Sequence, residues 1–368
     1  MSEILEIDKL ENFPHPRDNE NLRGLDTAQQ ALFDGFMSSK MHHAWIISGQ
    51  KGIGKATLAY KFAQFILEFK NPDNVRAAGL TSLTPNFNAI SAQQVRARSH
   101  PSLFVLKRAY NDKTKKFGQN INIENVRKAE QFINKTVEKG GWRVIIIDSA
   151  DDLNISSANA LLKSLEEPPQ NTVFLIISSL PAKLLPTIRS RCRMLKLPDL
   201  DEQVISQLLQ TYHVEMNAEE RDIILFLGQG SFARVLEVID VEGLEIYKKM
   251  LALLYQIPQI SRDDIHKLGS ELALKAVESK YIFFTEQYLA ILSRLIKFIS
   301  LGEAADAHMP LPNVEIKLFN HLKAHFTLDA LFSLWESSEQ KFRINAAFNM
   351  DKKQTIITEF LNLEKLAK

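Results

Sequence analysis

The chain has little cysteine, no long hydrophobic run and almost no net charge. Its 368 residues contain one cysteine, Cys192, so no intrachain disulfide and no multi-cysteine zinc cluster can form. The longest apolar runs, such as Val144–Ile147 and Val173–Ile177, have the length of strands and are too short to cross a bilayer. A formal charge of +1 provides no global attraction to nucleic acid or to an anionic membrane. We therefore expect a cytoplasmic, globular protein without a bound metal.

The first half of the chain alternates strand and helix signals. Short apolar runs predict buried strands at 44–48, 103–107, 144–148, 172–178 and 194–197. Helical patterns lie between them at 55–69, 123–137, 155–167 and 182–189. Continuous apolar strands separated by helices are typical of a parallel sheet covered on both faces, so we expect an α/β domain over residues 1–197.

The helix expected at 155–167 illustrates the pattern. Its apolar positions share one face at helical spacing: Ile155, Ala158, Leu161, Leu162 and Leu165. Asn154 is the expected N-cap, and Pro168 ends the helix because proline lacks an amide hydrogen.

The second half changes character after Pro198, where amphipathic segments follow one another without a convincing strand. A small helical domain is expected at 198–243, with helices at 202–212, 218–227 and 231–240. A larger all-helical domain is expected at 244–368, with helices at 244–255, 263–275, 278–299, 313–325, 328–350 and 353–366.

The segment GQKGIGKAT, Gly49–Thr57, has the outline of a phosphate-binding loop. Gly49, Gly52 and Gly54 allow a tight turn whose amides face phosphate oxygens. Lys55 would reach the terminal phosphates, and the following helix presents its positive end to the same anion. The alternative is a glycine turn with an incidental lysine. The strand before the loop and the helix after it favour the phosphate loop.

Two positions lack the groups that handle metal and water. Ala56 stands where such loops carry the hydroxyl that binds magnesium, and Thr57 is about 100° further round the helix. Asp148 ends an apolar strand, as a magnesium-binding Walker-B acid does. The next residue is Ser149, whose hydroxyl is too weak a base to activate water. We expect a chain that can bind ATP or ADP but has no intrinsic ATPase activity.

Ser156–Leu197 resembles bacterial sliding-clamp loaders, and within them the delta-prime subunits of DNA polymerase III. The similarity lies in NALLKSLEEPP followed by a strand and by SRC, and also in HHAWIISGQKGIGKATLA and GWRVIIIDSADDLN. It is strong over residues 25–197. It implies an AAA+ protein with a RecA-like nucleotide-binding domain, a helical lid and an oligomerising collar, in the order and with the boundaries given above.

The resemblance also implies site residues. In these rings each nucleotide site lies between subunits and is completed by a neighbour's arginine, which SRC matches to Arg191. GSFARVLEVI matches Arg234 to the sensor-2 arginine, and the strand end at Ser178 or Ser179 matches sensor 1. Composition alone favours a purely structural interpretation, in which Arg189, Arg191 and Arg193 are surface cations near a helix C-terminus. The SRC match reverses that preference for Arg191 only.

The partners implied are the gamma/tau and delta subunits in a hetero-pentameric ring, and through it the sliding clamp and primer-template DNA. Many delta-prime relatives carry a four-cysteine zinc module after the phosphate-loop helix, but residues 71–100 contain no cysteine, so no zinc is expected. The basic segment 107–128 is interpreted as a solvated turn rather than a DNA-facing hairpin.

Three functions compete. The first is a stator-like delta-prime subunit, deficient in hydrolysis, within a DNA-directed DNA polymerase (nucleotidyltransferase) holoenzyme of DNA replication. The second is an active clamp-loader ATPase of the gamma/tau type, against which Ala56 and Ser149 argue. The third is a DNA-binding protein acting alone, which the charge of +1 disfavours.

Overall fold

The computed structural model describes residues 13–38, 40–111, 114, 116–134, 141–274, 278–302, 309–348 and 350–367. The chain divides into two compact units. The first comprises Met1–Val214 and Gly230–Ala233, and the second comprises Glu215–Gln229 and Arg234–Lys368. The division into three domains at 197/198 and 243/244 stays a prediction.

A five-stranded parallel sheet forms the centre of the first unit, in the order β2-β5-β6-β1-β7. The strands are β1 (Ala44–Ser48), β2 (Leu103–Leu106), β5 (Arg143–Ile147), β6 (Thr172–Ser178) and β7 (Arg193–Lys196). β1 and β6 are buried along their whole length, which explains why their sequences are continuously apolar. The predicted parallel α/β sheet is confirmed.

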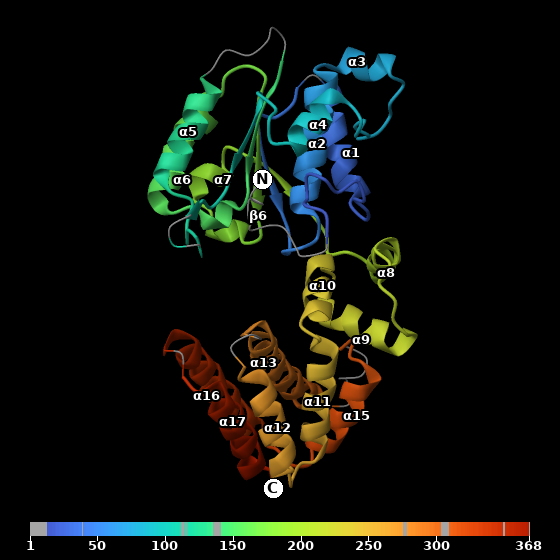
Figure 1. Cartoon of the computed structure of the whole chain (residues 1–368), viewed down its shortest axis with the longest axis vertical. Coiled ribbons are helices and arrows are strands. Elements are labelled where there is room, and N and C mark those ends of the chain that lie inside the picture. Colours follow the sequence, from blue (N-terminus) through green and yellow to red (C-terminus); the bar gives the residue numbers. More distant parts are fainter. Residues whose placement is uncertain are drawn as a thin grey trace. The chain divides into compact units, whose positions relative to one another are not determined.

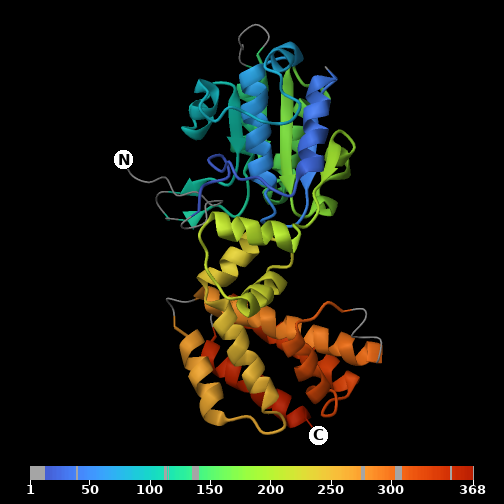
Figure 2. The ribbon, with the colours of Figure 1, turned by 90° about the vertical axis from the view of Figure 1, so that its right-hand side faces the viewer.

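Helices cover both faces of this sheet (Figure 1). One face carries α1 (Asp26–Met37), α2 (Lys55–Phe69) and α4 (Ile90–Arg96); α1 and α2 are drawn in blue in Figure 2. The other carries α5 (Ile123–Ile133), α6 (Ile155–Glu166) and α7 (Pro186–Arg189). The other elements of this unit are α3 (Pro72–Ala77), the hairpin β3 (Tyr110–Asn111) and β4 (Lys116–Phe117), η1 (Ala150–Asp152), η2 (Pro181–Lys183) and α8 (Glu202–Thr211).

Helix α6 confirms its predicted cap and corrects one apolar position. The Asn154 side chain accepts a hydrogen bond from the backbone nitrogen of Ser157 at 2.8 Å. Ile155, however, is 72% exposed. The helix begins at this residue, about one turn before the side chains that pack in the core, Ala158, Leu161 and Leu165.

The helix expected at 182–189 is wrong as a single element. The structure has η2 followed by α7, with Pro186 as the first residue of α7. Proline is tolerated in the first turn of a helix but interrupts a helix interior, because its ring clashes with the preceding turn.

The second unit is helical throughout its described residues. Its helices are α9 (Ala218–Gly228), α10 (Phe232–Asp240, whose first two residues belong to the first unit), α11 (Gly243–Tyr255), α12 (Arg262–Leu272), α13 (Glu278–Leu301), α15 (Asn313–Leu322), α16 (Leu328–Phe348) and α17 (Lys352–Leu366). Within the part of the chain that the structure describes, no helix combines the length and apolarity needed to cross a membrane.

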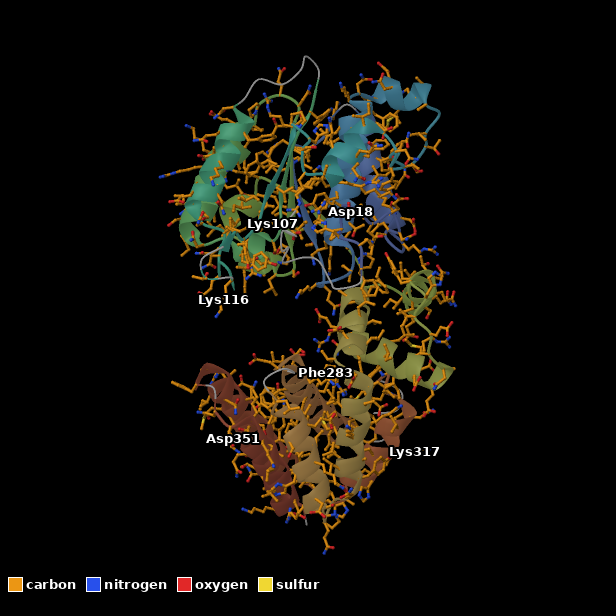
Figure 3. The ribbon with its side chains drawn as sticks, in the orientation of Figure 1. Asp18, Lys107, Lys116, Phe283, Lys317 and Asp351 are labelled. Carbon is orange, nitrogen blue, oxygen red and sulfur yellow. The ribbon has the colours of Figure 1, made fainter. Side chains whose placement is uncertain are left out.

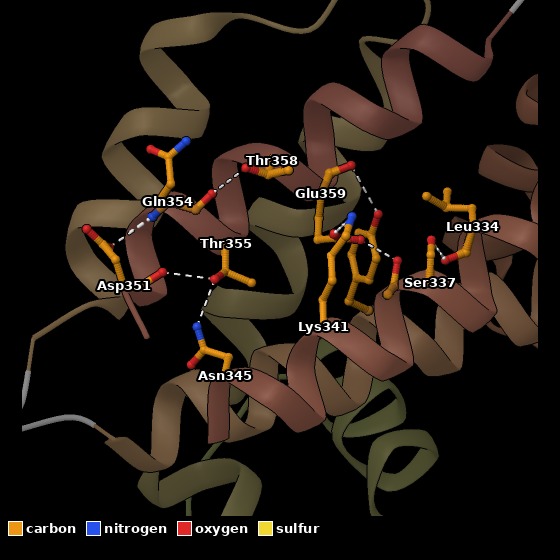
Figure 4. Close-up of polar contacts among 11 residues, drawn as sticks. Leu334, Ser337, Lys341, Asn345, Asp351, Gln354, Thr355, Thr358 and Glu359 are labelled. Carbon is orange, nitrogen blue, oxygen red and sulfur yellow. Dashed lines mark hydrogen bonds and ion pairs between the residues drawn. The ribbon is translucent and has the colours of Figure 1, made fainter. Parts of the chain in front are cut away.

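Two fully buried carboxylates tie these helices together. Glu315 on α15 receives two bonds from Arg294 on α13, at 2.8 and 2.5 Å, and one from the Tyr247 hydroxyl on α11 at 2.5 Å. Glu359 on α17 pairs with Lys341 on α16 at 2.8 Å (Figure 4) and accepts from the Ser338 hydroxyl. Both charges are buried only because they are paired and hydrogen-bonded.

Candidate functional site

The predicted phosphate loop connects β1 to α2 and depends on glycine. Gly49, Gly52 and Gly54 have φ values of 147°, 85° and 99°, in the region that side chains disfavour. A Cβ on Gly52 would lie 2.5 Å from both the Ala233 Cβ and the Ser231 Oγ. The glycines therefore permit both the turn and the close packing of residues 231–233 on the loop.

Lys55 is turned inward and is fully hydrogen-bonded. Only 5% of the residue is exposed, and its Nζ donates to the carbonyl oxygens of Gly49 at 2.8 Å and Gln50 at 2.6 Å, and to the Ser179 hydroxyl at 2.9 Å. Desolvation lowers the pKa of Lys55 to about 8, although Asp151 and Asp148 oppose that shift. The lysine is thus an ammonium group that is unusually ready to lose its proton.

Asp151 lies at the centre of a polar network, a position that the sequence pattern did not indicate. Its carboxylate accepts from the Ser178 hydroxyl at 2.5 Å, the Ser179 backbone nitrogen at 2.6 Å and the Ser149 hydroxyl at 3.0 Å. These bonds join the turn after β5 to the end of β6. Because β5 and β6 are neighbours in the sheet, only the fold brings Asp151 beside Ser178 and Ser179, the segment predicted to be sensor 1.

The site suits phosphate better than magnesium. The glycines and Lys55 supply amides and a cation, whereas Ala56 offers no oxygen ligand and Ser149 is committed to Asp151. Thr57 on the first turn of α2 is buried. Asp148, at the end of β5, lies near enough to raise the pKa of Lys55. Among the described residues no group of three or more His, Cys, Asp or Glu side chains is arranged to hold a metal ion.

Arg191 lies at the opposite end of the strands from the phosphate loop. It precedes β7, whose Arg193 pairs with Trp45 near the start of β1, whereas the phosphate loop follows the end of β1. By this register Arg191 is level with position 43. Six residues of strand, at roughly 3.3 Å each, separate that level from Gly49, a distance of about 20 Å. Arg191 therefore cannot reach the phosphate loop of its own chain.

The Arg191 guanidinium is partly exposed and is held by contacts within its own chain. It pairs with Glu166, the last residue of α6, at 2.7 Å, and donates to the Thr187 carbonyl oxygen at 2.8 Å. The side chain keeps 34% of its surface exposed. Its neighbour Cys192 is a poor nucleophile, because burial raises the pKa of the thiol to about 12.

Arg234 belongs to the second unit and is bound there by carboxylates. It pairs with Glu237 at 3.5 Å and with Glu286, and its guanidinium lies 5.9 Å from the ring centre of Phe283, labelled in Figure 3. Its assignment to sensor 2 stays a prediction.

The basic segment after β2 forms the β3–β4 hairpin, on which Lys116 is labelled in Figure 3. Arg108 pairs with Asp152 at 3.0 Å, so part of its positive charge is neutralised within the chain. Lys113 and Lys115, which belong to the same prediction, lie outside the described residues.

Sequence comparisons identify similar proteins. Residues 25–201 match the family described as DNA polymerase III, delta subunit. The delta-prime subunit of Pseudomonas aeruginosa is 38% identical over 165 residues, which are 45% of this chain and 46% of that protein, so this match spans about half of the relative's length. The delta-prime subunit of Escherichia coli is 26% identical over 80% of this chain and 81% of its own length.

A gamma subunit from Buchnera aphidicola is 26% identical over 87% of this chain and 80% of its own length. A solved Thermotoga maritima protein related to the gamma subunit of DNA polymerase III covers 92% of this chain and 99% of its own, at 16% identity and a TM-score of 0.43. Residues 25–201 therefore match the DNA polymerase III delta-subunit family, and the chain is similar over most of its length to a delta-prime subunit of DNA polymerase III.

Proposed function

We propose that this chain is a stator-like ring member of a clamp loader, which donates Arg191 to the ATP site of a neighbouring subunit and does not hydrolyse ATP itself. Its partners are gamma/tau and delta subunits, and through the ring the sliding clamp and primed DNA. The delta-prime and gamma relatives support membership of such a complex.

The observation that carries the proposal is the separation of Arg191 from the phosphate loop. The two lie at opposite ends of the strands of one sheet, so Arg191 cannot serve a nucleotide in its own loop, and its partial exposure supports a role toward a nucleotide on another chain. A guanidinium is always charged and its fork of donors suits phosphate oxygens. An arginine supplied in trans stabilises the charge that develops during phosphoryl transfer.

The residues around the phosphate loop support the proposal that this chain does not hydrolyse ATP itself. Ala56 provides no hydroxyl for magnesium. Ser149 stands where a base would activate water, and its hydroxyl donates a hydrogen bond to Asp151. Asp151 is itself saturated by donors and has no free oxygen with which to activate water. The phosphate loop retains the parts that bind an anion, but not those that cleave it.

The test is ATP turnover by the complex reconstituted with the cognate subunits. Arg191→Ala should lower kcat by about a thousandfold or more at the one site that it completes. The total turnover of the complex should fall by the fraction that this site contributes. Arg189→Ala, a neighbouring exposed arginine, is the matched control and should leave turnover unchanged. Equal turnover in the wild-type and Arg191→Ala complexes would refute the assignment.

A second candidate is an active ATPase of the gamma/tau type. The glycine loop with its buried Lys55 and the similarity to the Buchnera gamma subunit favour it. The two functions differ in the isolated chain, where only an active ATPase turns over ATP in a way that Lys55→Ala abolishes. We expect no such turnover.

A further inference from the structure

Lys55 is saturated by acceptors from its own chain, and one of the three is a side chain. An ammonium group has three N–H donors, and Lys55 directs them at the carbonyl oxygens of Gly49 and Gln50 and at the Ser179 hydroxyl. A phosphate that binds this lysine must therefore displace at least one of them. The hydroxyl is the only one of the three that a substitution can remove without changing the backbone.

Ser179 is held in place by Asp151. Its backbone nitrogen donates to one carboxylate oxygen at 2.6 Å, while the other oxygen accepts from the Ser178 hydroxyl at 2.5 Å. The Ser149 hydroxyl and the Leu180 backbone nitrogen complete the set at 3.0 and 3.4 Å. With so many donors around it, this carboxylate fixes the end of β6 beside the lysine.

We propose that Ser179 competes with phosphate for Lys55 and so sets the affinity of the loop for di- and triphosphate groups, with Asp151 as the residue that positions the competitor. This inference rests on the proposed capacity of the loop to bind phosphate, and is independent of the role of Arg191. Under this proposal Ser179, in the segment matched to sensor 1, binds Lys55 when no phosphate is bound, and does not act on the reacting phosphate.

Removal of the hydroxyl should strengthen anion binding. In Ser179→Ala the free state of Lys55 loses one acceptor, whereas the phosphate-bound state loses nothing. One net hydrogen bond in a protein corresponds to an affinity change of about threefold to tenfold. Pyrophosphate is the suitable probe, because it occupies the loop without a base or sugar that could bind elsewhere.

The experiment titrates pyrophosphate into the full-length wild-type chain and Ser179→Ala by calorimetry at pH 7.5. The dissociation constant should be about threefold to tenfold lower for Ser179→Ala. Ser157→Ala is the matched control, because it removes a buried serine hydroxyl of the same unit, bonded to the Ile121 carbonyl oxygen, and leaves all three acceptors of Lys55. Its affinity should stay within about twofold of wild type.

A second pair of variants tests the role of Asp151. Asp151→Asn should raise the affinity because it releases the backbone of Ser179, but it also removes a negative charge near the anion. Asp148→Asn is the charge control, because Asp148, like Asp151, raises the pKa of Lys55, so both variants remove a negative charge that acts on the same lysine. A larger gain for Asp151→Asn than for Asp148→Asn isolates the positioning effect, and equal gains would refute it.

Unchanged binding in Ser179→Ala would overturn the competition, and weaker binding would show that the hydroxyl contacts the phosphate directly. If neither the wild-type chain nor Ser179→Ala binds pyrophosphate, the competition and the anion-binding role of the loop both fail. The role of Arg191 would remain, because turnover by the complex measures it separately. Circular dichroism of each variant verifies that its fold is intact.

Discussion

At the scale of single residues, the proposed function separates phosphate binding from ATP hydrolysis. Lys55 and the three loop glycines remain in the geometry of an anion cradle, while the positions that handle magnesium and water are occupied by Ala56 and Ser149. The prediction that hydrolysis is lost could be made from the sequence, because it depends on one residue type at each of two positions. The sequence could not predict the role of Asp151, which depends on contacts with a neighbouring strand.

The lowered pKa of Lys55 makes anion binding depend on pH. Only the protonated lysine attracts phosphate, and in the free loop its pKa is about 8. As the pH rises above about 8, the free lysine loses its proton, and the affinity for ADP should fall by roughly tenfold per pH unit. Calorimetric titration of ADP between pH 7 and 9.5 measures this slope.

Lys55→Arg is the control for this profile, since its guanidinium stays charged over the whole range. Its affinity for ADP should be independent of pH. An equally flat profile for the wild-type chain would contradict the proposed contact between the Lys55 ammonium group and the phosphates.

At the scale of elements, local patterns were sufficient for the sheet and for most helices. β1, β6 and α2 have the predicted bounds, because continuous apolar runs and helical periodicity are properties of the segments themselves. The hairpin β3–β4 was not predicted as strands, because two-residue strands carry no periodic signal. Helix α1 was also missed, although Leu32, Phe33 and Phe36 are spaced for one face of a helix.

The buried ion pairs of the second unit were not predicted either, since periodicity does not indicate which charged residue of an amphipathic helix faces inward. Glu315 is fully buried, and it is stabilised by partners on two other helices. Glu315→Ala would leave the Arg294 guanidinium, only 16% exposed, without its carboxylate. We expect the free energy of unfolding of the second unit to fall by about 3–5 kcal/mol.

Urea denaturation of the full chain, followed by far-ultraviolet circular dichroism, measures this loss. Glu271→Ala is the control, because it breaks an exposed pair with Lys249 and should cost less than about 1 kcal/mol. Similar losses for the two variants would show that the Glu315 junction does not stabilise the unit.

At the scale of the whole molecule, the chain consists of a sheet unit and a helical unit, and the segment expected to form the lid is shared between them. Helix α8 belongs to the first unit, whereas α9 and most of α10 belong to the second. The sequence indicated the change from α/β to all-helical structure after Pro198. It could not indicate this division, because compact units are defined by contacts that are distant in sequence.

The central claim for the whole molecule is that its contribution to catalysis lies at Arg191 and acts on another chain. The phosphate loop and Arg191 can be compared in one assay, because they lie at opposite ends of the strands. A substitution at either one leaves the contacts of the other unchanged. Substitutions at the two sites should therefore affect the assembled complex differently.

The most direct measurement is the DNA-stimulated ATPase rate of complexes reconstituted with the wild-type chain, Arg191→Ala or Lys55→Ala. We predict that Arg191→Ala lowers the rate by the share of the site that it completes, and that Lys55→Ala leaves it unchanged. A loss of rate with Lys55→Ala and an unchanged rate with Arg191→Ala would contradict the account, because hydrolysis would then take place in this chain.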